Sequence, residues 1–178
     1  MAKRKHLNLY TPTGNGAKGE YNYTGDYFVP VLHGRNLRRL KIGLLFQCLI
    51  QFTLLFFIGS SDPYGLRTLY VMPFFLFLFF FMGRASLAAF GFFAWEERMT
   101  QSQYEGSWMR FRHSQMGIAI TCGLLALSDI VMVLLGSPIS KESALLVLSL
   151  PVIAISTLCF FVIKNVSCSK ASVSLTPE

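Results

Sequence analysis

The sequence predicts an all-α integral membrane protein with four transmembrane helices. Of its 178 residues, 53% are hydrophobic and only 14% are charged, whereas soluble domains usually carry about 25% charged residues. A chain of this length has room for a single domain, and it cannot cover several wholly apolar helices with polar layers. The composition excludes a disordered chain and a disulfide-rich secreted module.

Four apolar segments are long enough to cross a bilayer. Spanning about 30 Å of hydrocarbon takes roughly 20 residues in a helix, because each residue adds about 1.5 Å. The predicted transmembrane domain, residues 42–163, therefore holds four spans, at residues 42–59, 69–95, 116–136 and 144–163. In the second span, small residues such as Ala85, Ala88, Ala89 and Gly91 predict a close contact between helices.

The basic residues predict the orientation of these spans. Thirteen of the 16 Lys and Arg residues lie before the first span, between the second and third spans, or after the fourth span. The two short hairpins between the other spans hold only Arg67 and Lys141. The positive-inside rule therefore predicts that both termini are cytoplasmic. With no sign of glycan or disulfide chemistry outside, a bacterial cytoplasmic membrane is the expected location.

Residues 1–41 form a basic cytoplasmic segment with strand-like patterns. Alternating residues at 7–10 and 20–24 flank a stretch that is rich in Gly, Pro and Thr, and residues 27–29 follow a turn signal. The pattern predicts a β-hairpin or a three-stranded meander. An isolated hairpin is marginally stable, so it must lean on the membrane surface, on the central loop or on a partner. The alternative is a disordered basic tail.

The connection between the second and third spans predicts a cytoplasmic helical extension. Thr100 with Gln103, and Ser102 with Glu105, both fit the capping box that starts a helix. No proline follows before the third span, so the helix should run on into it without a break. After the fourth span, residues 164–178 are expected to form a disordered cytoplasmic tail.

Four basic residues crowd the entry to the first span. Arg35, Arg38, Arg39 and Lys41 lie within seven positions of one another. Such a cluster is typical of contact with anionic lipid headgroups. Nucleic-acid binding is not expected, because it would need basic residues spread over a folded surface together with stacking aromatic side chains.

Arg84 and Asp129 are the two ionisable residues inside the predicted spans. Charged residues at membrane depth are rare and costly, so each one marks a candidate functional site. Measured from the predicted inner ends of their spans, the two residues lie at similar depths, and they predict an ion pair. The pair is either a structural lock between two helices or part of a polar cavity. The alternative is that Arg84 extends to the inner interface without Asp129.

Further polar residues could join this site. Gln47 and Gln51 are four positions apart and share one face of the first span. Ser149 and Ser156 flank Pro151 in the fourth span and could line the same interior. In membrane helices, such side chains more often hold helices together than bind a ligand.

No catalytic or metal-binding motif is present. The three histidines are isolated, no Cys-x-x-Cys occurs, and no nucleotide-binding or nucleophile motif appears. The expected function is therefore that of a non-enzymatic accessory, assembly or regulatory subunit without a cofactor, with the bilayer and a protein or second copy as partners. The alternative is an oligomeric transporter or channel using Arg84 and Asp129, with a membrane-embedded enzyme as a third reading.

Overall fold

The computed structural model describes residues 10–12, 21–23, 25–32, 34–60, 71–93, 98–136, 139–166 and 168–171. Helices dominate this part of the chain, and four of them are long and apolar enough to cross a membrane. This agrees with the predicted class, a multi-pass helical membrane protein. The elements that form the bundle are α1 (Gly34–Ser60), α2 (Met72–Phe93), α4 (Arg110–Leu134) and α5 (Ile139–Asn165).

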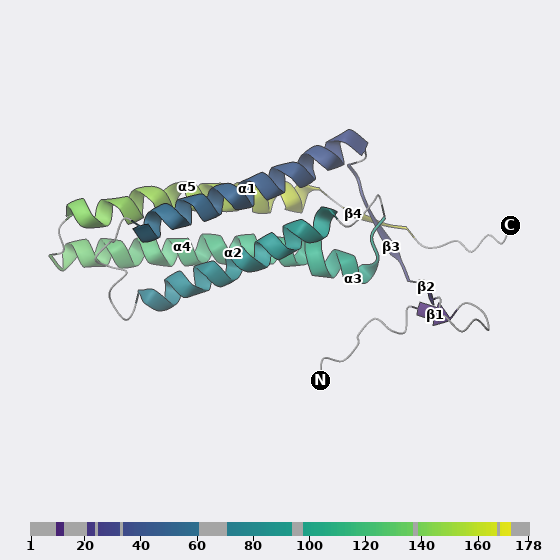
Figure 1. The fold of residues 1–178 in the computed structure, drawn as a ribbon, viewed down its shortest axis with the longest axis horizontal. Coiled ribbons are helices and arrows are strands. Elements are labelled where there is room, and N and C mark those ends of the chain that lie inside the picture. The colour runs from purple at the N-terminus through teal and green to yellow at the C-terminus, as the bar shows by residue number, and fades with distance from the viewer. Residues whose placement is uncertain are drawn as a thin grey trace.

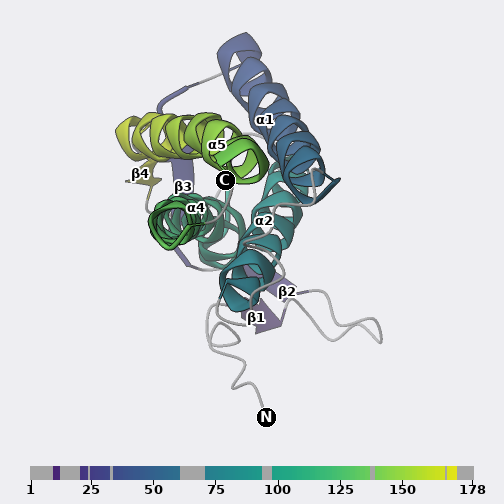
Figure 2. The same cartoon turned by 90° about the vertical axis from the view of Figure 1, so that its left-hand side faces the viewer.

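The long helices run alternately up and down and form one elongated bundle (Figure 1). Viewed along its length, α4 lies beside both α2 and α5, and α1 closes the bundle by packing on α2 and α5 (Figure 2). Connections between consecutive antiparallel helices produce this neighbour order with short loops.

Large apolar side chains cover the outside of the bundle. Phe56 is 73% exposed, Leu87 is 69% exposed and Leu134 is 80% exposed. An apolar surface of this extent is unfavourable in water but is well solvated by lipid tails. The interior combines large apolar side chains, such as Leu55, Phe92 and Phe111, with small and polar ones. Ala85, Ala88 and Ala89 are almost completely buried, which confirms the close helix contact predicted for the second span.

The third membrane helix begins well before its predicted span. Three consecutive pieces, α3 (Gln101–Gln103), the π-helical segment η3 (Tyr104–Met109) and α4, make one continuous helix from Gln101 to Leu134. Of the two possible capping boxes the structure forms the one at Thr100, whose hydroxyl accepts from the Gln103 amide while the Gln103 side chain accepts from the Thr100 amide. The helical extension therefore joins the third span without interruption.

Short strands gather at the end of the bundle where α2 ends and α3 begins (Figure 1). We call this end, with β3 (Tyr27–Pro30), β4 (Cys168–Ala171) and Met99, the strand end, and the opposite end the far end. β1 (Tyr10–Pro12) pairs with β2 (Tyr21–Tyr23) in an antiparallel hairpin. β3 pairs antiparallel with β4 rather than with β2.

The pairing of β3 bears on two predictions. Of the two forms predicted for the N-terminal segment, the structure has the β1–β2 hairpin and not the three-stranded meander, because β3 pairs with β4. The prediction of a disordered tail is wrong for residues 168–171, which form β4. On the other side of β3, the amide of Phe28 donates to the carbonyl of Met99 at 2.8 Å, and the amide of Met99 donates back at 2.9 Å. Each backbone edge of β3 thus finds a partner that lies far away in the sequence, which local patterns cannot reveal.

Aromatic side chains attach the N-terminal segment to the start of the third helix. The rings of Phe28 and Tyr104 stack with their centroids 4.3 Å apart. The hydroxyl of Tyr23 accepts a hydrogen bond from the Gln101 amide at 3.0 Å and donates to the Asp26 carbonyl at 3.1 Å. The support that the sequence analysis required for an isolated hairpin therefore comes from the connection before the third span.

Candidate functional site

A hydrogen-bonded polar cluster lies inside the bundle, and Gln115 of α4 is at its centre. The Nε2 groups of Gln47 and Gln51 both donate to Oε1 of Gln115, at 3.0 and 3.2 Å. Gln51 Nε2 also donates to the hydroxyl of Ser156 in α5 at 2.7 Å. All four side chains are buried. These hydrogen bonds join α1, α4 and α5. Gln47 and Gln51 can both take part because they lie one helical turn apart on one face of α1.

Two polar atoms of this cluster remain without a partner among the described residues. They are Oε1 of Gln47 and Nε2 of Gln115. A buried polar group without a hydrogen bond costs free energy. A water molecule or small polar ligand could donate to Oε1 of Gln47 or accept from Nε2 of Gln115. Gln115 and Ser156 also line a cavity of about 230 Å³ between α4 and α5. The cluster contains amides and a hydroxyl, which can hold a polar group but cannot act as acid or base near neutral pH.

The contact between α2 and α4 fixes how these two helices are aligned. A Cβ built on Gly117 would lie 2.6 Å from the ring of Phe81, and one built on Gly91 would lie 2.5 Å from the hydroxyl of Ser107. These contacts place residue 81 level with residue 117, and residue 91 level with residue 107. Arg84 is therefore level with Ser114.

This alignment does not bring Arg84 and Asp129 together. Asp129 lies 15 residues beyond Ser114 in α4, which is about 22 Å along the helix. The side chain of Asp129 is buried, whereas that of Arg84 is exposed. The described residues therefore do not form the expected ion pair, because residue 116, taken as the inner end of the third span, lies level with the middle of α2 rather than with its end.

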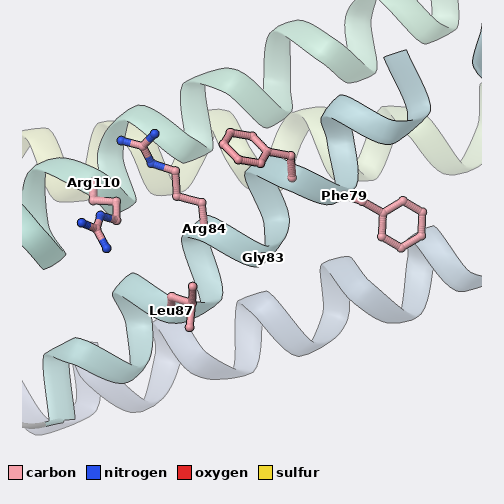
Figure 3. Close-up of a pocket in the computed structure, with 6 residues that line it drawn as sticks. Phe79, Gly83, Arg84, Leu87 and Arg110 are labelled. Atoms are coloured by element: carbon pink, nitrogen blue, oxygen red, sulfur yellow. The ribbon is translucent and has the colours of Figure 1, made fainter. Parts of the chain in front are cut away.

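Arg84 instead shares a pocket with Arg110 on the outer surface of the bundle. The pocket has a volume of about 520 Å³ and is lined by Phe79, Phe80, Gly83, Arg84, Leu87 and Arg110. Figure 3 shows the Arg84 side chain extended along the bundle in the direction of Arg110. In the sequence, Arg110 is only one of the charges that predict the orientation, and nothing there indicates that it shares a pocket with Arg84.

The predicted lipid-contact cluster lies in the first two turns of α1. Arg35, Arg38 and Arg39 are exposed and Lys41 is half-buried, while Leu37 between them is buried. Their positions leave the charges available to headgroups at the strand end, and the contact itself stays a prediction.

The described cysteines are free, and Cys48 and Cys122 are buried within the helices. Cys168, in β4, is half-buried, and burial raises the pKa of its thiol to about 11. At neutral pH it is therefore a protonated, weakly reactive group. Within the part of the chain that the structure describes, no group of three or more His, Cys, Asp or Glu side chains is arranged to hold a metal ion.

Comparison with protein-family models, with curated proteins and with solved structures found no match to this chain.

Proposed function

We propose that this protein is a non-enzymatic accessory, assembly or regulatory subunit of a bacterial cytoplasmic membrane, with both termini inside the cell. One observation carries the proposal: the strand end joins three distant parts of the chain in a single folded unit. β3, β4 and Met99 are connected by backbone hydrogen bonds, and Phe28 stacks on Tyr104.

An ordered unit of this kind supports a role in protein contacts. Helix connections in membrane proteins can be short and simple when their only task is to link spans. Here the connection before the third span is fixed by a capping box and by hydrogen bonds to the N-terminal segment. Val31 and Arg98 are exposed on this unit, and Val31 is 58% exposed. An exposed apolar residue and an exposed arginine are both suitable contacts for a partner protein.

The test is purification in a mild detergent followed by native mass measurement. We expect a second protein in fixed stoichiometry, and we expect Val31→Asp and Arg98→Glu each to remove it. Leu135→Asp, which alters a residue 75% exposed at the far end, is the matched control and should keep the partner. A homo-oligomer without a foreign subunit would count against the proposal.

The second candidate is an oligomeric transporter or channel, and the polar cluster around Gln115 favours it. Gln47 and Gln115 each have a buried polar atom without a partner among the described residues, and Gln115 lines a cavity. The separation of Arg84 from Asp129 argues against a transport path that uses both residues. Flux through liposomes containing the purified protein, lost in Gln115→Leu and kept in Thr53→Val, would support transport; flux unaffected by Gln115→Leu or Asp129→Asn would reject it.

A further inference from the structure

The pocket between α2 and α4 places two cations from different helices on one apolar surface. Arg84 comes from the middle of α2, and Arg110 begins α4. Both side chains are exposed. No ion pair joins either guanidinium group to an acidic residue in the described part of the chain. Two like charges in apolar surroundings repel each other, and an anion between them would relieve that repulsion.

The depth of the pocket is suited to a headgroup. Arg84 lies nine residues before Phe93, which is about 14 Å from that end of α2. Arg110 lies one turn closer to the strand end than Ser114, the residue level with Arg84. The Arg84 side chain extends toward Arg110 (Figure 3), so its guanidinium group lies closer to the strand end than its Cα atom does. A long arginine side chain can reach from within a span toward the phosphate region in this way.

The remaining walls are suited to an acyl chain. Phe79, Phe80 and Leu87 are 44%, 59% and 69% exposed, and they belong to the lipid-facing surface of α2. Gly83 lies between them, and a Cβ built there would meet nothing within 4 Å. The absence of a side chain at this position leaves a groove that leads from the two arginines along the bundle.

We propose that the pocket formed by Arg84 and Arg110 binds the headgroup of one anionic phospholipid. The phosphate accepts hydrogen bonds from both guanidinium groups, whose planar donors match phosphate oxygens. The acyl chain lies over Gly83 against Phe79 and Phe80. A soluble anion is not the expected occupant. The walls of the pocket are apolar and belong to membrane-spanning helices, and a soluble anion has no apolar part that could contact them. The site differs from the basic cluster at the start of α1.

The experiment measures lipid binding to the full-length, delipidated protein in detergent by native mass spectrometry. We expect one tight adduct with phosphatidylglycerol and at least tenfold weaker binding of phosphatidylcholine. Arg84→Gln and Arg110→Gln should each weaken the phosphatidylglycerol adduct about tenfold, because each removes one charged donor pair. Lys164→Gln, which removes one exposed positive charge from the last turn of α5 at the same end of the bundle, is the matched control and should leave binding unchanged.

Two further measurements keep the outcome decisive. Arg84→Lys retains the charge and should bind the lipid more tightly than Arg84→Gln. The helical circular dichroism of all variants should equal that of the wild type. Inorganic phosphate at millimolar concentration should not displace the lipid. Equal binding by the wild type and the two Gln variants would overturn the proposal, and so would displacement by inorganic phosphate, which would make the site one for soluble anions.

Discussion

Gln115 is the residue on which the interior of the bundle depends most. Its carbonyl oxygen accepts hydrogen bonds from both glutamines of α1, and its side chain is completely buried. Polar side chains hold membrane helices together because lipid offers them no hydrogen bonds. The glutamines of α1 are recognisable in the sequence, but Gln115 was not singled out there, because it lies just before the predicted start of its span.

We expect Gln115→Leu to destabilise the bundle by about 1–2 kcal/mol, because it removes the acceptor of two buried amide groups. Unfolding of the detergent-solubilised protein by increasing mole fractions of sodium dodecyl sulfate measures the change. Thr53→Val is the control, since the exposed Thr53 hydroxyl bonds only to the carbonyl of Leu49 in its own helix, and it should shift stability by less than about 0.5 kcal/mol. Equal stability of Gln115→Leu and the wild type would contradict the central role of Gln115.

The alkylation of Cys168 should depend on pH in an unusual range. Its pKa is about 11 rather than the ordinary 9.0, and only the thiolate reacts. In a variant with the other three cysteines changed to Ala, we expect iodoacetamide labelling at pH 9 to be tens of times slower in the folded than in the denatured protein. The rate should rise with pH until about 11. A rate that levels off near pH 9 would show that the thiol is not buried by the β3–β4 pairing.

At the scale of elements, the spans follow from the sequence, whereas their alignment does not. Length and apolar composition identify each helix, because few other structures satisfy the backbone in lipid. The alignment of α2 with α4 depends on Gly117 fitting the ring of Phe81 and on Gly91 fitting Ser107. These contacts involve the shape of two surfaces, and a single sequence does not carry that information in its periodicity. The expected Arg84–Asp129 pair failed for this reason.

Two glycines of α4 provide a matched test of that alignment. A methyl group at Gly117 would lie within 2.6–2.8 Å of the Phe81 ring, while one at Gly123 would meet nothing within 4 Å. We therefore expect Gly117→Ala to destabilise the protein by about 1–3 kcal/mol through overpacking. Gly123→Ala should stabilise it by up to about 1 kcal/mol, since alanine is the better helix former.

The same unfolding assay measures both variants. Adding Phe81→Leu to Gly117→Ala should restore part of the lost stability, because the smaller side chain removes the clash. If both glycine variants behaved alike, the α2–α4 contact would not have the described alignment.

At the scale of the molecule, the two ends of the bundle have different character. The strand end carries β3, β4 and exposed basic residues of α1. Among the described residues of the far end, Leu134 at the end of α4 and the adjacent Leu135 are exposed and apolar. The orientation is a prediction from the charge pattern of the sequence, and it can be tested separately from the fold. The contact surface proposed at the strand end, in contrast, was not predictable from sequence, because its exposed residues come from segments that meet only after folding.

Labelling of single introduced cysteines should reveal which end faces the cytoplasm. In a variant lacking the native cysteines, we expect Asp26→Cys at the strand end to react with a membrane-impermeant maleimide only after the cells are permeabilised. Leu135→Cys at the far end should react in intact cells. Both positions are exposed, so burial does not explain a difference. The opposite pattern would invert the topology.

The pairing of β3 with β4 also bears on the order in which the molecule is made. β3 precedes all four membrane helices in the chain, and β4 follows them. During synthesis β3 therefore emerges before the partners of either backbone edge, Met99 and β4. Its pairing can be completed only when the last helix has left the ribosome and entered the bilayer. Closing so long a loop is slow, and an open strand edge invites pairing with other chains. A finished strand end is consequently a sign of a completely inserted molecule, so a partner that recognises it would bind mature copies and ignore nascent ones.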